Sequence, residues 1–258
     1  MNRMKIGIYQ FNPYFGNKEK NLQKVKEAIA KSNCDLVTLP ELFSTGYSFK
    51  DRNELQRYSE PTPNGETTQY LIEIAKEKNC YIIGGIAEKD GDNLYNSAIV
   101  VAPNGFISKY RKIHLFYKEK FIFQKGNLPL KIYDIEGFRV GTIICFDWIF
   151  PEACRTLALQ GAYIIVHPSN LIKPWAQMAM RIRSIENRVY IILANRIGTE
   201  DRSGEKLKFT GKSQITSPAG DVLLSFPKNQ EKFDFIEINP RDAENKYFTP
   251  YNNLFEEI

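Results

Sequence analysis

The chain has 258 residues, the length of one large α/β domain, and its composition gives no reason to divide it. Hydrophobic residues make up 43% and aromatic residues 13%, which is enough for a large core and excludes a disordered chain. The net charge of +5 comes from interspersed signs, so it does not predict a nucleic-acid partner. No apolar run approaches the ~20 residues of a membrane span, so no membrane partner is predicted.

Strand-like and helix-like patterns alternate along the chain. The apolar run Met4–Tyr9 predicts a first strand, and Leu22, Val25 and Ile29 share one face of a helix predicted over 17–32. Later strands are predicted at 35–39, 81–87, 94–101, 106–110, 138–144, 163–166, 190–194, 208–217, 221–226 and 233–238. Later helices are predicted at 66–78, from Pro151 to near Gly161, and at 175–188.

Two turns predict that the middle of the fold is antiparallel. Asp90-Gly91 is typical of a hairpin turn, and Pro103-Asn104-Gly105 turns the chain again. Elsewhere strands and helices alternate as in βαβ units, so the predicted class is α/β with mixed sheets and helices on their faces. Residues 1–258 are predicted to form one domain. Its tail, 241–258, has no clear periodicity and is expected to dock on a neighbour or to fray.

The four cysteines, Cys34, Cys80, Cys145 and Cys154, form no CxxC pair and are too few for a disulfide framework. Reduced thiols are therefore expected, with no zinc site. The first residues lead directly into an apolar strand, without a signal-peptide hydrophobic region. The cytoplasm is the predicted compartment.

Three polar or nucleophilic residues, Glu41, Lys112 and Cys145, lie just beyond the C-terminal ends of predicted strands. In open α/β sheets, ligands bind at that edge. If the three strands are neighbours, the side chains converge on one site. The sequence alone does not establish that the strands are neighbours.

Cys145 has the setting of a reactive cysteine. It lies between a buried strand and a helix predicted to start near Pro151, where helix amides and a nearby ammonium would favour the thiolate. Most cysteines are instead small apolar core residues, and this interpretation is adopted for Cys34, Cys80 and Cys154. Cys145 is therefore the candidate nucleophile.

Glu41 and Lys112 can each also be explained without a catalytic role. Glu41 is followed by apolar residues, so desolvation is expected to raise its proton affinity, which suits a general base. The alternative is a capping or solvated acid. Lys112 stands among other charged residues, which usually mark an exposed face. Taken alone, the pattern around Lys112 favours that exposed face.

Three sequence blocks favour a catalytic role for these residues: Leu39–Leu42, Tyr110–Phe116 and Cys145–Glu152. In order and spacing they resemble the signature blocks of the nitrilase superfamily of carbon–nitrogen hydrolases. Further similar segments are His167–Asn170, Glu186–Arg188, Ala194–Arg196 and Phe209–Ser213. The resemblance covers nearly the whole chain.

The resemblance implies a four-layer αββα sandwich with a Glu41–Lys112–Cys145 triad, usually assembled as a dimer or multiples of dimers. Glu41 would take the thiol proton, and Cys145 would attack the substrate carbon. Lys112 and the backbone N–H of Phe146 would hold the oxyanion. The resulting thioester would be hydrolysed by water, so no metal or organic cofactor is required. Glu119 resembles a second glutamate that positions substrate, although alternation with lysines is equally typical of a solvated face.

The residues after Cys145 indicate the substrate. Branches of the resembled family that bind carboxylated carbamoyl amino acids commonly have arginines here, whereas Trp148-Ile149-Phe150 offers no fixed cation, which favours a neutral or small aliphatic substrate. Dedicated nitrilases commonly have Trp-Glu directly after the cysteine, so the pair Phe146-Asp147 favours an amide. Nitrile and carbamoyl substrates remain open, because similar blocks occur in members of both kinds. The candidate pocket residues are Tyr47, Trp148, Asn170 and Trp175, although large aromatics are more often core residues.

Two rival classes were weighed. A serine or cysteine peptidase would need a catalytic His, but the chain has only His114 and His167 and no GxSxG elbow. His167 before Pro168 is expected to be structural. A ligand-binding sandwich without turnover is disfavoured by the intact triad. Neither GxGxxG nor GxxxxGK[ST] occurs, and Gly84-Gly85 is interpreted as strand glycine.

Overall fold

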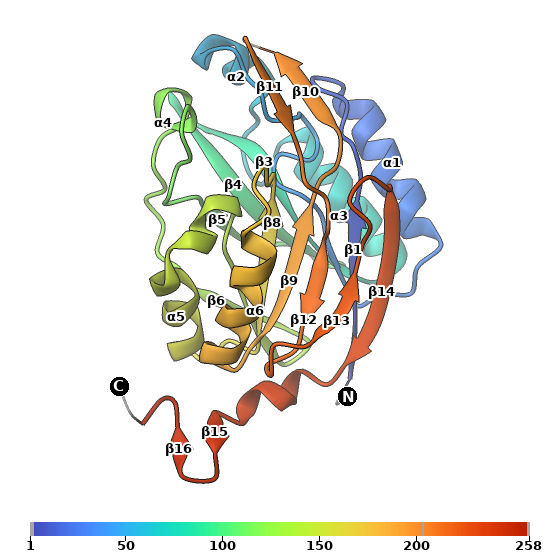
Figure 1. Cartoon of the computed structure of the whole chain (residues 1–258). Helices are drawn as coiled ribbons and strands as arrows, with labels where there is room; N and C mark the ends of the chain where they lie inside the picture. Colours follow the sequence, from blue (N-terminus) through green and yellow to red (C-terminus); the bar gives the residue numbers. More distant parts are fainter. Residues whose placement is uncertain (1–2, 203, 257–258) are drawn as a thin grey trace.

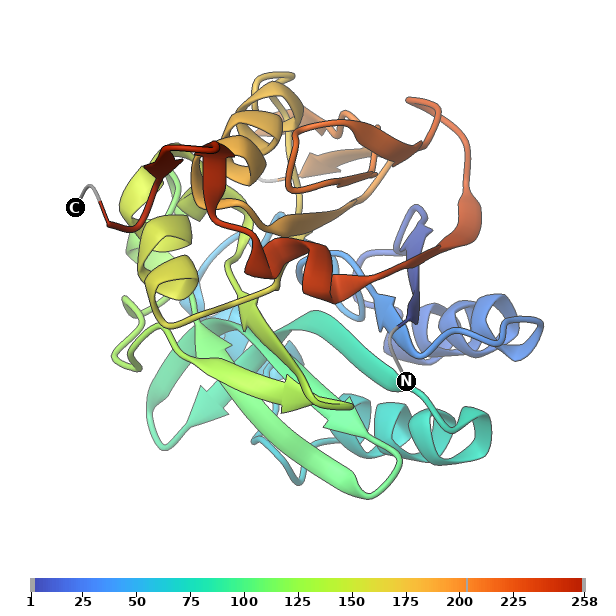
Figure 2. The same cartoon turned by 90° about the horizontal axis from the view of Figure 1, so that it is seen from below.

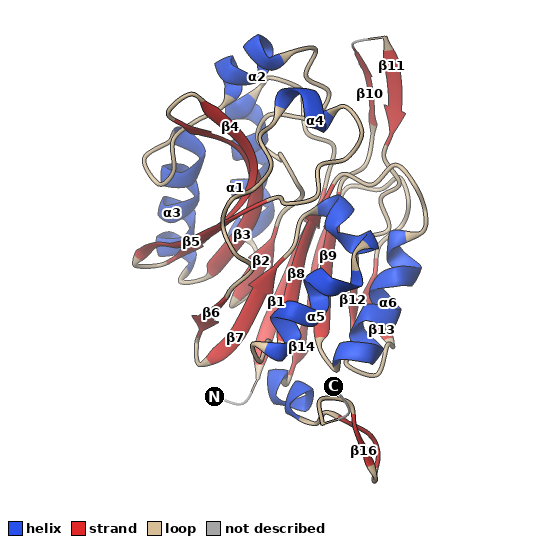
Figure 3. Cartoon of the chain, turned by 90° about the vertical axis from the view of Figure 1, so that its left-hand side faces the viewer, coloured by secondary structure: helices blue, strands red, loops and turns tan. Residues whose placement is uncertain are grey.

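The computed structural model describes residues 3–202 and 204–256, which contain two six-stranded sheets stacked face to face (Figures 1 and 3). The first sheet has the order β14 (Lys232–Ile238), β1 (Met4–Gln10), β2 (Leu36–Thr38), β3 (Tyr81–Asp90), β4 (Asn93–Ala102) and β5 (Gly105–Arg111). The second has the order β13 (Val222–Ser225), β12 (Gln214–Thr216), β9 (Tyr190–Asn195), β8 (Ile164–Ser169), β7 (Phe138–Thr142) and β6 (Ile132–Ile135).

Both sheets are mixed. Strands β1, β2 and β3 are parallel, and so are β7, β8 and β9. Strands β3, β4 and β5 pair antiparallel through the two predicted turns, which confirms the antiparallel middle of the chain. The parallel strands require helical crossovers, and those helices supply the outer layers.

Helices cover the outer face of each sheet. α1 (Lys18–Ala30) and α3 (Glu66–Lys78) pack on the first sheet, and α5 (Pro151–Leu159) and α6 (Ala176–Asn187) pack on the second (Figure 2). Side chains alternate between the two faces of a strand, so each strand contacts both the other sheet and the helices. Ile164 and Val166 on β8 face the other sheet, while Ile165 faces α5 and α6. The predicted αββα sandwich is confirmed.

One predicted strand, 208–217, is wrong in its bounds. Its beginning belongs to β11 (Glu205–Lys208), which forms a separate hairpin with β10 (Thr199–Arg202), and only Gln214–Thr216 joins the second sheet as β12. Gly211 separates them with φ +56°, and a Cβ there would lie 2.2 Å from the Lys228 carbonyl oxygen. This left-handed turn, which glycine allows, breaks the strand.

Several short elements were not predicted from periodicity: α2 (Arg52–Tyr58), α4 (Glu119–Ile122), β6 and the β10–β11 hairpin. The tail also has structure, with a 3-10 helix at Pro240–Glu244 and a small hairpin of β15 (Tyr247–Thr249) and β16 (Asn252–Asn253). It lies at the lower end of Figure 1, and Phe255 packs against the core beside α5 and α6. Across the described residues, every helix is too short or too polar to cross a bilayer.

Candidate active site

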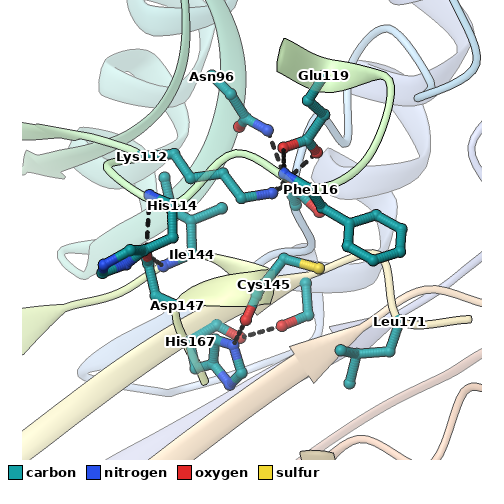
Figure 4. Close-up of polar contacts among 12 residues, drawn as sticks. Asn96, Lys112, His114, Phe116, Glu119, Ile144, Cys145, Asp147, His167 and Leu171 are labelled. Carbon is teal, nitrogen blue, oxygen red and sulfur yellow. Dashed lines mark hydrogen bonds and ion pairs between the residues drawn. The ribbon is translucent and has the colours of Figure 1, made fainter. Parts of the chain in front are cut away.

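Glu41, Lys112 and Cys145 converge, but not from neighbouring strands. Glu41 follows β2 and Lys112 follows β5, two strands that β3 and β4 separate within the first sheet. Cys145 follows β7 in the second sheet. The site therefore lies where the ends of both sheets meet, and adjacency within one sheet does not explain it (Figure 4).

A glycine on β3 lets the Glu41 backbone reach the site. The Cα of Glu41 lies so close to Gly85 that a Cβ on residue 85 would be 2.5 Å from it. Backbone hydrogen bonds hold this approach, since the Gly85 N–H donates to Pro40 and the Phe43 N–H donates to Gly85. Any larger residue at position 85 would displace Glu41.

Asn96 on β4 connects the segment that contains Glu41 to the segment that contains Lys112. Its Nδ2 donates to Glu41 Oε1 at 2.7 Å, and its backbone carbonyl accepts from the Lys112 N–H at 2.8 Å. Asn96 is buried and fixes the carboxylate relative to the lysine (Figure 4). Sequence reasoning missed this residue, because nothing distinguishes one asparagine within a strand.

Lys112 joins two carboxylates. Its Nζ lies 2.7 Å from Glu41 Oε1 and 2.8 Å from Glu119 Oε1. The exposed fractions are 0% for Glu41, 1% for Lys112 and 3% for Glu119, so the exposed-face interpretations of Lys112 and Glu119 are wrong. The second oxygen of Glu119 accepts the Phe116 N–H, which fixes the carboxylate at the start of α4.

The electrostatics of this cluster follow from burial and close charges. Burial alone would lower the pKa of Lys112, but Glu119 and Glu41 raise it above the ordinary value, so the ammonium is kept. Burial raises the pKa of Glu119, and Lys112 opposes that effect. One cation thus stands between two carboxylates in a site with little access to water.

Cys145 has a strained backbone and a thiol whose pKa is raised. It begins a 3-10 helix, Cys145–Ile149, with φ +38°, a left-handed conformation that is unfavourable for a residue with a side chain. Burial and the neighbouring Glu41 raise the pKa of its thiol well above the ordinary value, although Lys112 and the Asn170 backbone N–H act against them. α5 begins at Pro151, as the sequence predicted, but burial and Glu41 act against the thiolate that the sequence favoured at Cys145.

Asp147 ties the Cys145 turn to the Lys112 segment. Its buried carboxylate accepts the Ile144 N–H at 2.8 Å and the Tyr110 hydroxyl at 2.8 Å, and it lies 2.7 Å from His114 Nδ1. Tyr110 and His114 flank Lys112 in the sequence at two residues on either side. Sequence reasoning missed this role of Asp147, which depends on contacts between distant segments.

His167 supports the turn at Cys145 through the backbone. Its Nε2 lies 2.9 Å from the Cys145 carbonyl oxygen, and burial lowers its pKa to about 4. The ring is therefore neutral at neutral pH. This contact agrees with the structural role that the sequence predicted for His167.

Two cavities open beside these side chains. One of about 90 Å³ contains Cys145 and is lined by Phe146 and by three predicted pocket residues, Trp148, Asn170 and Trp175. The fourth, Tyr47, lines a cavity of about 260 Å³ beside Glu119. Within residues 3–202 and 204–256, no group of three or more His, Cys, Asp or Glu side chains is arranged to hold a metal ion.

Comparisons with known proteins agree with this fold and identify the family. The carbon–nitrogen hydrolase family model matches residues 5–245. A nitrilase from Pyrococcus abyssi is 46% identical over 257 residues, covering 98% of this chain and 97% of the relative. An omega-amidase from Homo sapiens is 36% identical over 213 residues, covering 77% of this chain and 74% of the relative.

Solved structures give the same result. The crystal structure of a carbon–nitrogen hydrolase from Helicobacter pylori G27 superposes with a TM-score of 0.86 at 25% identity, covering 94% of this chain and 91% of the other. The chain is thus a hydrolase of the nitrilase superfamily. It belongs to the carbon–nitrogen hydrolase family.

Proposed function

We propose that the protein hydrolyses the carbon–nitrogen bond of a small aliphatic amide, with Cys145 as nucleophile and ammonia as leaving group. The observation that carries the proposal is the buried Lys112 ammonium, which bonds to both Glu41 and Glu119 beside the thiol. A buried cation placed in this way can stabilise charge that develops on a substrate oxygen.

The proposed acylation step begins with Glu41. Because burial raises the pKa of the Cys145 thiol, the thiol needs a base, and Glu41 Oε2 is buried without a hydrogen-bond partner among the described residues. Glu41 takes the proton as sulfur bonds to the amide carbon, and Lys112 with the Phe146 N–H holds the oxyanion. When the carbon–nitrogen bond breaks, Glu41 returns the proton to the nitrogen and ammonia leaves.

Hydrolysis of the thioester uses the same groups. Glu41 takes a proton from water, the hydroxide oxygen bonds to the acyl carbon, and the sulfur leaves as the carboxylic acid forms. The proton then restores the Cys145 thiol. Glu119, fixed by Lys112 and the Phe116 N–H, is proposed to accept a hydrogen bond from the substrate nitrogen. Each step balances with water as the only co-reactant.

We prefer an amide to a nitrile or carbamoyl substrate. The cavity that contains Cys145 has mostly apolar walls, including Phe146, Trp148 and Ile149, and this supports a neutral aliphatic substrate. Relatives include an omega-amidase, a citrullinase and a nitrilase, so all three bond types occur among similar chains. Nitrilase and carbamoyl hydrolase activity by the same mechanism are the alternatives.

Intact-mass spectrometry of wild type and Cys145→Ala tests the proposal. Both proteins are exposed to short aliphatic amides, nitriles and ureido acids, and released ammonia is measured in parallel. We expect an acyl adduct and ammonia from amides with the wild type alone. The mechanism is wrong if no substrate gives a Cys145-dependent adduct or ammonia, and the bond assignment is wrong if only nitriles or ureido acids react.

We also propose a homodimer, or an oligomer built from dimers. Three large apolar side chains spaced along one face of the α6 region, Trp175, Met178 and Ile182, are 55%, 65% and 50% exposed. Exposed apolar faces of this kind are typical of interfaces. The tail, 241–258, is proposed to contribute through Phe248 and Tyr251, which are also exposed. Light scattering of the wild type should give twice the chain mass or more, and Met178→Asp should lower it.

The cytoplasm remains our proposed compartment. All four cysteines are free thiols and buried, as a reducing environment would keep them. Fractionation of cells that carry the untagged protein would test it. Recovery from an exported fraction would contradict the proposal.

A further inference from the structure

The cavity beside Glu119 is about three times larger than the cavity that contains Cys145, at about 260 Å³ against about 90 Å³. We call it the hairpin cavity, because the β10–β11 hairpin forms one side of it through Arg202, Glu205 and Leu207. Phe116 and Ile172 line both cavities, so the two spaces meet at these side chains. The Phe116 ring packs 5.0 Å from the ring of Phe146, next to Cys145.

We propose that the hairpin cavity is the subsite for the part of the substrate distal to the reacting carbon, that it takes an uncharged alkyl or aryl group, and that Leu207 limits its length. The inference rests on the proposed amide hydrolysis and deepens it. The reacting carbon needs the space at Cys145, and about 90 Å³ leaves little room there for a longer chain. The larger cavity begins next to the same site, at Tyr47 and Glu119.

The residues that line the hairpin cavity determine which kind of substrate group it can bind. Seven of the lining side chains are apolar or aromatic: Tyr47, Phe49, Phe116, Tyr117, Ile122, Ile172 and Leu207. Such a lining favours apolar substrate groups, whose transfer from water into the cavity is favourable.

The charges that line the hairpin cavity are already paired. Glu205 lies 3.0 Å from Lys118 Nζ and accepts the Tyr117 hydroxyl, while Arg202 lies 2.6 Å from Glu54. Glu119 is paired with Lys112. A charged substrate group would gain no free partner from these four side chains and would lose its water.

The hairpin is a fixed wall of the cavity. Glu200 at its base accepts the backbone N–H of Ser48 at 2.6 Å and of Tyr47 at 3.2 Å, and it pairs with the fully buried Arg196. Arg202 donates to the Ser48 carbonyl and stacks on Phe15. The hairpin thus positions the Tyr47 turn and Leu207 relative to each other, so a change at Leu207 alters the depth of the cavity without freeing its walls.

The test is a chain-length series, measured as kcat/KM for acetamide, butyramide and hexanamide, and for the corresponding nitriles. Leu207→Trp fills the cavity and should lower the hexanamide-to-acetamide ratio by about tenfold or more, and Leu207→Ala should raise it. Leu223→Ala on β13, a leucine outside both cavities, is the matched control and should leave the ratio as in the wild type. Circular dichroism melts verify that each variant is folded.

Three results would overturn the inference. The first is an unchanged ratio in both folded Leu207 variants. The second is a ratio that responds to Trp175→Ala, in the cavity at Cys145, instead of to Leu207. The third is preference for succinamic acid or 4-aminobutanamide over uncharged amides of the same length. All three leave hydrolysis intact, whereas a wild type that turns over no amide or nitrile overturns the proposed function as well.

Discussion

Two buried ionic clusters begin at consecutive residues of the chain, Arg111 and Lys112, and they have opposite character. Arg111 and Lys109, which share one face of β5, bond to Glu88, whereas Lys112, just beyond the end of β5, bonds to Glu41 and Glu119. The end of β5 thus separates a cluster within the first sheet from the cluster at Cys145.

The hydrogen bonding of the two clusters differs. Both oxygens of Glu88 are bonded: Oε1 to Lys109 and Arg111, and Oε2 to Ser97 and Arg111. Glu41 has one oxygen bonded to Lys112 and Asn96, while Oε2 has no partner among the described residues. A saturated carboxylate stabilises the fold, and an unsaturated buried one has a lone pair free for a proton.

The largest effect should come from Glu41→Gln. The amide keeps an oxygen for Lys112 and Asn96 but cannot take the thiol proton, so kcat should fall by about 10²–10⁴ with little change in melting temperature. Ammonia release and thermal melts measure the two effects. If Glu41→Gln retained the wild-type kcat, Glu41 would not be the general base. The proposed difference between the two clusters would then be wrong as well.

Lys112→Ala should lower kcat by about 10²–10³, because it removes a donor to the oxyanion. It also leaves Glu41 and Glu119 buried without their cation, so a loss of stability is expected as well. Single-turnover kinetics on protein shown to be folded separates the two effects. Lys109→Ala, in the cluster at Glu88, is the control and should leave kcat within about tenfold of wild type.

Glu88→Gln should act on stability instead. Breaking a buried pair costs about 3–5 kcal/mol, so urea unfolding should show a loss of that size while kcat changes less than about tenfold. Arg111 and Lys109 lower the pKa of Glu88 despite its burial. Its contribution is therefore present above the ordinary Glu pKa and is lost as pH falls through the lowered value. The free energy of unfolding of Glu88→Gln should therefore fall less than that of the wild type as pH decreases. An unchanged dependence of stability on pH would contradict this prediction.

The smallest expected effect is on the rate at which the Cys145 thiol is alkylated in the absence of substrate. Because burial raises its pKa, iodoacetamide should label it more slowly than an exposed cysteine at neutral pH. The rate should rise with pH and reach no plateau near the ordinary cysteine pKa. Peptide mass spectrometry distinguishes Cys145 from the other three cysteines. A plateau below that pKa would indicate a thiolate, as the sequence had predicted.

Periodicity and turn chemistry predicted most regular elements, with α3 and α5 close to their observed bounds and both hairpin turns of the first sheet in place. They did not predict the β10–β11 hairpin, whose short strands carry too few residues for a period. The resemblance identified Glu41, Lys112 and Cys145 as residues of one site. Asn96 and Asp147 were missed, because their contacts join segments far apart in the chain.

The sequence by itself determined the family and the residue types of the site, since these depend on motifs read in order. Local patterns predicted mixed sheets with helices on their faces, and the resemblance implied the αββα layers. Only the tertiary structure decided that the site lies where two sheets meet, that Lys112 and Glu119 are buried, and that burial raises the pKa of Cys145. Burial and hydrogen-bond saturation depend on every segment that packs around a side chain. For that reason the adjacent residues Arg111 and Lys112 look alike in sequence and belong to different clusters in the folded protein.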